Sequence, residues 1–162
     1  TRVPLLVRAP GMPGGEVCNS LCETVDIYPT LAELANVPVT EPLEGRSLVP
    51  CLKNPDASVK NYALSQFPRY EPENLMGYTL RTDRHRITRW ESLKDNRARG
   101  LEIYDHMTDP AETRNIAAPE AVTTAESRHT VTELDHLLTQ TWRSAHRGAT
   151  PIGEARPAEP LS

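Results

Sequence analysis

The chain opens on a short apolar run at residues 3–7, flanked by two arginines. The residues behind the run are typical of a turn: Pro10, Gly11, Pro13 and Gly14. A continuous apolar run of this length, bounded by turn residues, is typical of a strand buried in a sheet. The pattern predicts a strand at Val3–Val7, although a terminal segment is normally loose unless other elements hold it.

A helix is predicted next, from Asp26 to Ala35. Asp26 suits the N-cap position, and a proline is tolerated in the first turn. The apolar face at helical spacing consists of Ile27, Leu31 and Leu34. Residues 41–55 are punctuated by prolines and are predicted to form a loop that crosses the surface.

Four strands are predicted between residues 61 and 106, because apolar and polar positions alternate there. They span residues 61–67, 76–82, 85–92 and 101–106. Asp83 and Arg84 are expected to form a two-residue hairpin turn. A long helix is predicted from Pro119 to Ala145; its apolar stripe consists of Val122, Ala125, Val131, Leu134, Leu138 and Trp142. Strands followed by a helix are typical of an α+β arrangement.

Composition narrows the class of function. The chain has 162 residues and a formal net charge of −4, which argues against a general nucleic-acid-binding surface. Its apolar runs are too short to span a membrane. Arginines and acids alternate within residues 81–99, either as a mixed charged face or as an anion-binding patch. Cys18, Cys22 and Cys51 match no zinc-binding spacing.

Several segments resemble, in this order, the C-terminal third of type I sulfatases. They read RVPLLVRAPG, TVDIYPTLAELANVP, LEGRSLVPCL, YALSQFPR, MGYTLRTDRHRITRW and EIYDHMTDPAETRNIA. SQFPR at 65–69, together with MGY at 76–78 and RT at 81–82, is similar to the iduronate 2-sulfatase-like branch. The resemblance covers the chain from Thr1 to about residue 143.

The resemblance implies an α/β fold of the alkaline phosphatase and sulfatase type, of which this chain would be a C-terminal fragment. Residues 1–55 would supply the last strand and helix of the large domain and a crossing segment. Residues 56–146 would form a four-stranded antiparallel sheet with a long packing helix. Residues 147–162, rich in proline and glycine, are predicted to be a disordered tail.

The chemistry that the resemblance implies lies outside this chain. The family hydrolyses sulfate esters with a formylglycine, made from the first residue of a C/S-x-P-x-R motif, and a Ca²⁺ ion that stabilises the developing charge. None of Cys18, Cys22 and Cys51 begins such a motif, and the family's metal ligands belong to upstream segments. We therefore expect no catalytic residue and no metal ligand here, and no activity without an N-terminal catalytic part.

Arg69, which follows the strand at 61–67, is the candidate substrate-binding residue. A planar guanidinium suits the carboxylate or sulfate of an acidic sugar. The alternative is that Arg69 braces its loop through backbone carbonyls. Residues 70–75 form a short loop, whereas iduronate-specific relatives can carry a longer insert there, so the identity of the sugar stays open.

Other polar residues are predicted to have structural roles. His85 and Arg86, beside the hairpin turn, are expected to be solvated. His129, Glu133 and His136 share one helix face at i, i+4 and i+7, which indicates a plain polar face rather than a metal site. Asp26 and Thr30 are expected to cap a helix rather than to contact a ligand.

Two classes of function remain. The first is the C-terminal portion of a sulfatase that acts on sulfated saccharides, is exported to the periplasm, the extracellular space or the lysosome, and works only with its N-terminal part. The second is a stand-alone, non-catalytic module that binds sulfated glycans or a partner protein.

Overall fold

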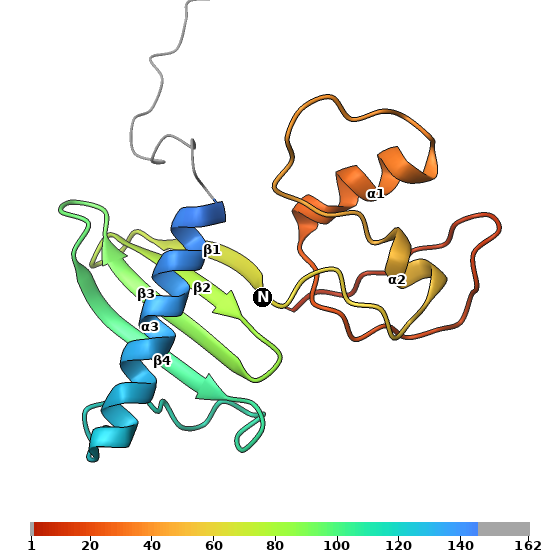
Figure 1. Cartoon of the computed structure of the whole chain (residues 1–162). Helices are drawn as coiled ribbons and strands as arrows, with labels where there is room; N and C mark the ends of the chain where they lie inside the picture. Colours follow the sequence, from red (N-terminus) through yellow and green to blue (C-terminus); the bar gives the residue numbers. More distant parts are fainter. Residues whose placement is uncertain (1, 146–162) are drawn as a thin grey trace, which may run out of the picture.

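The computed structural model describes residues 2–145 (Figure 1). Its elements are η1 (Thr24–Asp26), α1 (Ile27–Leu34), α2 (Val49–Lys53), β1 (Ala63–Arg69), β2 (Leu75–Arg81), β3 (His85–Ser92), β4 (Ala98–Asp105) and α3 (Ala125–Ala145). Figure 1 shows the four strands and α3 together in one lobe, which we call the sheet lobe. Residues 2–60, with η1, α1 and α2, form a loop-rich lobe beside it, which we call the helical lobe.

The sheet lobe is an antiparallel meander with the strand order β1-β2-β3-β4. One row of aligned apolar residues crosses all four strands: Leu64, Leu80, Ile87 and Ile103. Leu138 of α3 packs on this row, and α3 lies across the same face of the sheet (Figure 1). Each fully buried side chain of this size contributes about 1.5–3 kcal/mol to stability. The predicted four-stranded antiparallel sheet with a long packing helix is confirmed.

The strand ends differ from the predicted ones by a few residues. β1 continues beyond residue 67, because Arg69 still pairs with Leu75 of β2. β4 begins at Ala98 rather than at residue 101, and the β3–β4 register shifts between Trp90 and Glu91. The predicted turn at residues 83–84 is confirmed by a 2.9 Å hydrogen bond from the Thr82 N–H to the His85 carbonyl.

The long helix α3 begins at Ala125, later than the predicted start at Pro119. Thr124 and Ser127 set this start, because each side-chain oxygen accepts the other residue's backbone N–H at 3.0 Å. Such a reciprocal cap satisfies N–H groups that the first turn leaves without partners. The predicted tail at 147–162 lies outside the described residues.

The predicted strand at Val3–Val7 is wrong for this structure. Residues 2–9 pair with no strand in the described part of the chain, and Val3 and Leu6 expose 66% and 90% of their surface. A strand requires a neighbouring ladder, and an apolar run indicates burial without indicating the partner. Val3–Val7 therefore forms no strand within residues 2–145, and the assignment of residues 1–55 to the end of a large domain stays a prediction.

The helical lobe contains one predicted helix and one that the sequence analysis missed. α1 begins after Asp26 as predicted. α2 lies where a crossing loop was predicted, with Pro50 in its first turn, a position that tolerates proline. Leu48 and Val49 anchor this segment, because both are buried. None of the helices within residues 2–145 has both the length and the apolar character needed to cross a membrane.

Candidate functional site

Arg69 lies at the end of β1, on the face of the sheet opposite α3. The register places it diagonally next to Trp90 of β3, through the aligned row of Phe67, Gly77 and Trp90. The central carbon of its guanidinium lies 4.2 Å from the centroid of the Trp90 ring. This is a cation–π contact, so the Arg69 head group is positioned by an aromatic face rather than by backbone carbonyls.

Gly77 allows the Trp90 ring to lie flat on the sheet. A Cβ atom at position 77 would come within 2.8 Å of Cζ3 of the indole, closer than carbon atoms approach in proteins. On the other side of Trp90, position 100 is also a glycine, and Trp90 Nε1 donates to Glu102 Oε1 at 2.9 Å. The indole is therefore held in one orientation by β2 and β4.

Arg69 differs from most arginines of the sheet because it has no carboxylate partner within the described residues. The side chains of Arg84, Arg86, Arg89 and Arg99 form ion pairs with Asp105, Glu112, Asp135 and Asp95. These pairs favour the mixed charged face over the anion-binding patch for residues 81–99. Arg69 is exposed, as are the neighbouring aromatic residues Phe67 and Tyr70. We call Phe67, Arg69 and Trp90, which lie on one face of the sheet, the Arg69 surface.

The Arg69 surface can bind an anion without breaking an existing ion pair. A guanidinium stacked on an indole keeps its N–H groups at the edge of the plane, where a carboxylate or sulfate accepts them. The exposed Phe67 ring on the same face supplies apolar contact area. The sequence indicated Arg69 but not Trp90, because the pairing of the two depends on strand register and on Gly77.

His85 and Arg86 are less exposed than predicted. Both are half-buried, and burial lowers the pKa of His85 below its usual value. Arg86 donates from Nε and Nη2 to the two oxygens of Glu112, at 2.7 and 2.5 Å, and lies over the Tyr104 ring. The expectation that they are solvated is wrong, and for Arg86 the reason is that the loop after β4 places Glu112 against β3.

Glu112 connects this cluster to the loop after β4. Its Oε1 lies 2.6 Å from Nε2 of His106, and the Arg86 guanidinium, against the opposing effect of burial, lowers the pKa of Glu112 to about 2 from an ordinary value of 4.5. Because the pKa is lower in the folded state, the ionised carboxylate stabilises the fold above about pH 5, and this stabilisation is lost as the pH falls toward about 2.

We expect Glu112→Gln to reduce the acid sensitivity of the fold. Between about pH 6 and about pH 3 the wild type should lose about 1–2 kcal/mol more free energy of unfolding than Glu112→Gln, a value reduced for partial solvent screening. Urea unfolding at both pH values measures the difference. Equal losses in the two proteins would show that Glu112 is not the acid-sensitive partner.

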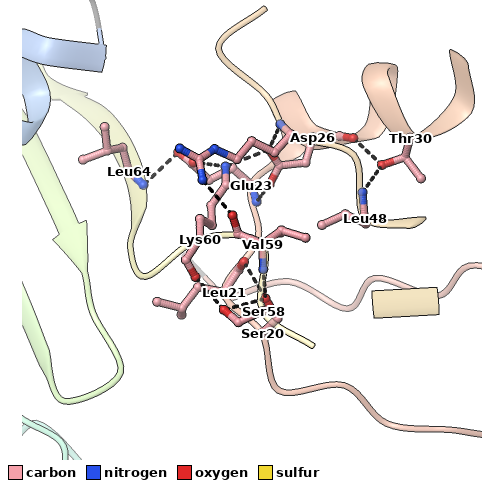
Figure 2. A network of polar contacts seen from close by, with 11 residues as sticks. Ser20, Leu21, Glu23, Asp26, Thr30, Leu48, Ser58, Val59, Lys60 and Leu64 are labelled. Carbon is pink, nitrogen blue, oxygen red and sulfur yellow. Dashed lines mark hydrogen bonds and ion pairs between the residues drawn. The ribbon is translucent and has the colours of Figure 1, made fainter. Parts of the chain in front are cut away.

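The helical lobe contains a buried polar network, drawn in Figure 2. The Lys60 ammonium lies 2.6 Å from Oε2 of Glu23 and 2.7 Å from Oδ1 of Asp26. Burial alone would lower the pKa of Lys60, but the hydrogen bonds to Asp26 and Glu23 outweigh it and raise that pKa. Both acids also accept backbone N–H groups: Asp26 from Arg46 and Glu23 from Leu64. The network thus joins η1 to the start of β1.

Asp26 and Thr30 have structural roles, as predicted: the Asp26 carboxylate does not cap α1, but it completes the capping box of η1 by accepting the Glu23 N–H. Asp26 occupies the N-cap position without a side-chain capping bond, because its carboxylate is used by Lys60 and by the backbone N–H groups of Glu23 and Arg46. Thr30 Oγ1 donates to the Asp26 carbonyl at 2.6 Å and accepts the Leu48 N–H at 2.9 Å. The sequence analysis missed Lys60 and Glu23, because nothing in their spacing indicates that they meet.

The histidines of α3 form no metal site in the structure. His129 lies 3.2 Å from Glu133, and His136 lies 3.3 Å from Gln140. These are polar contacts along one exposed helix face, in agreement with the predicted plain polar face. Across residues 2–145, no three side chains of His, Cys, Asp or Glu are arranged to hold a metal ion.

Comparison with protein families gives a match over nearly the whole described chain. The family described as N-sulphoglucosamine sulphohydrolase, C-terminal, matches residues 1–141. Arylsulfatase K of Gallus gallus is 34% identical over 131 residues, which cover 75% of this chain and 24% of that protein. Arylsulfatase K of Homo sapiens is 32% identical over 123 residues, with 71% and 22% covered. The chain therefore spans about a quarter of the length of these relatives.

A further sulfatase matches a shorter part of the chain, and two solved structures share its fold. The extracellular sulfatase SULF-1 homolog of Drosophila melanogaster is 35% identical over 60 residues, which cover 37% of this chain and 5% of that protein. BT4656, solved with its substrate D-glucosamine-2-N,6-O-disulfate, superposes with a TM-score of 0.60 at 24% identity over 80% of this chain and 25% of that one. A structure from glycosaminoglycan metabolism by Bacteroides thetaiotaomicron gives 0.63 at 16% identity, with 89% and 30% covered.

Proposed function

Because the chain belongs to the sulfatase family and matches its C-terminal domain, we propose that it is the C-terminal portion of a sulfuric ester hydrolase that acts on sulfated saccharides. The observation that carries the proposal is the family match over residues 1–141. The finer assignment to the iduronate 2-sulfatase-like branch rests on the segments at 65–69, 76–78 and 81–82 alone. The named relatives are arylsulfatases K, so the branch stays a proposal.

The proposed role of this portion is to contribute to saccharide binding. Arg69 is exposed, stacked on Trp90 and without a carboxylate partner in the described part of the chain. A sulfated acidic sugar offers anionic groups for the guanidinium and apolar ring faces for Phe67. The Arg69 surface therefore offers groups that suit the anionic groups and the apolar ring faces of such a substrate.

The reactive groups of the family do not fit the residues at positions 2–145. Ca²⁺ requires several oxygen ligands converging on one point, and no three-residue group of potential ligands occurs within residues 2–145. Neither a cysteine nor a serine of the sequence begins a C/S-x-P-x-R motif, so formylglycine has no position here. We therefore propose that an N-terminal catalytic part supplies both, and no step of the hydrolysis is assigned to these residues.

We also propose that the protein is exported. The support is the extracellular sulfatase of Drosophila melanogaster, whose 60 matched residues are 35% identical. The compartment affects whether the cysteines are reduced or oxidised. It does not affect the proposed role of Arg69.

The direct test of the proposed function is sulfate release. The polypeptide consisting of this chain and an N-terminal sulfatase part is expected to release sulfate from a sulfated uronate disaccharide in the presence of Ca²⁺, whereas residues 1–162 alone are expected to release none. Ion chromatography of free sulfate measures both. Turnover by residues 1–162 in a preparation free of other sulfatases would overturn the proposal, as would binding of sulfated glycans without any hydrolysis by the longer polypeptide.

A further inference from the structure

Two of the three cysteines of the helical lobe point at the same backbone carbonyl. Cys18 Sγ lies 3.7 Å and Cys51 Sγ 3.5 Å from the carbonyl oxygen of Ala57, to which both thiols donate. Cys18 belongs to the segment that precedes η1, and Cys51 belongs to α2. The fold thus brings together two thiols that are far apart in the sequence.

The backbone around this carbonyl is held in place by several contacts. The Ala57 N–H donates to the Asn54 carbonyl at 3.0 Å, which fixes the turn after α2. Ser20 Oγ lies 3.5 Å from Ser58 Oγ and accepts the Val59 N–H at 3.4 Å, so the segment around Cys18 runs beside residues 57–59. These backbone contacts therefore hold the segments that carry the two thiols next to each other.

The surroundings of the third cysteine differ. Cys22 is exposed, whereas Cys18 and Cys51 are half-buried, and all three are free thiols. Among the described residues, only Cys18 and Cys51 donate to the Ala57 carbonyl. Burial raises the pKa of Cys51, the nearby Cys18 thiol raises it further, and the Ser20 hydroxyl acts in the opposite direction. Burial and the Asp26 carboxylate raise the pKa of Cys22.

We propose that Cys18 and Cys51 are a redox pair that forms a disulfide, which links the segment before η1 to α2. This inference does not depend on the proposed function. Such a bond would close a long loop that contains η1, α1 and the Asp26 carboxylate, and would thereby restrict the unfolded chain. It would also fix the extended residues before η1, which no strand pairing holds.

The reaction requires an oxidant, which is a small-molecule or protein disulfide. The thiolate of Cys18 or Cys51 attacks one sulfur of that disulfide, and the other sulfur leaves as a thiolate. The second cysteine thiolate then attacks the mixed disulfide and releases the remaining half of the oxidant. The chain loses two protons and two electrons, and the oxidant takes them up and becomes two thiols. Because the Cys51 pKa is raised, the reaction should be faster at alkaline pH.

The test is thiol mapping on the folded, full polypeptide that contains this chain, before and after incubation with oxidised glutathione. Free thiols are alkylated, the bridge is reduced, and the newly exposed thiols receive a second label. Cleavage after Leu21 separates Cys18 from Cys22 for mass spectrometry. We expect Cys18 and Cys51 to carry the second label and Cys22 the first, so that two of the three thiols are lost on oxidation.

Two serine variants test which cysteines form the bridge. Cys22→Ser should form the same bridge, whereas Cys51→Ser should leave both remaining thiols open to alkylation. The proposal is overturned if Cys18 and Cys51 stay reactive in the oxidised folded protein, if the bridge contains Cys22, or if a bridge forms only after denaturation. The mapping does not require the serine variants to fold, because the wild-type pattern alone decides between these outcomes.

Discussion

Asp26→Ala is expected to lower the free energy of unfolding of the helical lobe by about 3–5 kcal/mol, the usual cost of removing one partner from a buried ion pair. Asp26 is fully buried, and its carboxylate accepts from the Lys60 ammonium and from the N–H groups of Glu23 and Arg46. Without it, Lys60 keeps one carboxylate, Glu23, and two backbone donors lose their acceptor.

Urea unfolding measured by far-UV circular dichroism gives the global effect, and native-state hydrogen exchange of the Leu48 amide reports locally. The Leu48 N–H donates to Thr30 rather than to Asp26, so the substitution does not remove its acceptor. Asp56→Ala, an exposed acid in the same lobe, is the matched control and should change stability by about 0.5 kcal/mol or less. Similar losses for the two variants would contradict a structural role for the buried network.

The sheet lobe could be predicted because its alternating pattern has a single cause, the packing of one face of the sheet against α3. Leu80, Ile87 and Ile103 alternate with polar residues, and the register aligns them under Leu138 of α3. The absence of a strand at Val3–Val7 could not be predicted in the same way. An apolar run indicates that a segment is suited to burial, but the described residues supply no strand beside it.

The polar contacts were harder to predict from the sequence. Lys60 and Asp26 are separated by 34 residues, and each alone resembles an ordinary surface charge. Arg69 could be selected because it follows a strand and belongs to a family-like segment. Its contact with Trp90 follows from two cross-strand alignments and from the missing side chain of Gly77, which no local pattern indicates.

Arg69→Ala is expected to lower kcat/KM for a uronate-containing sulfated saccharide by about ten- to a hundredfold, the loss of one charge-assisted hydrogen bond. Turnover of a small arylsulfate, which lacks the sugar carboxylate, should change little. The guanidinium is stacked on Trp90, is exposed and has no carboxylate partner in the described part of the chain, so its removal breaks no ion pair. Arg69→Lys should recover only part of the loss, because an ammonium cannot bind a carboxylate through two parallel N–H groups.

Arg97→Ala is the matched control, because Arg97 lies between β3 and β4, its side chain is 80% exposed, and its ion pair with Asp95 is long, at 3.9 Å. It should leave both activities and the melting temperature unchanged. The decisive measurement is the ratio of kcat/KM for the saccharide to kcat/KM for the arylsulfate, in the wild type and in Arg69→Ala of the longer polypeptide. If the Arg69 surface binds saccharide, the ratio falls about ten- to a hundredfold at an unchanged melting temperature. An unchanged ratio, with parallel losses on both substrates and a lower melting temperature, would contradict that role.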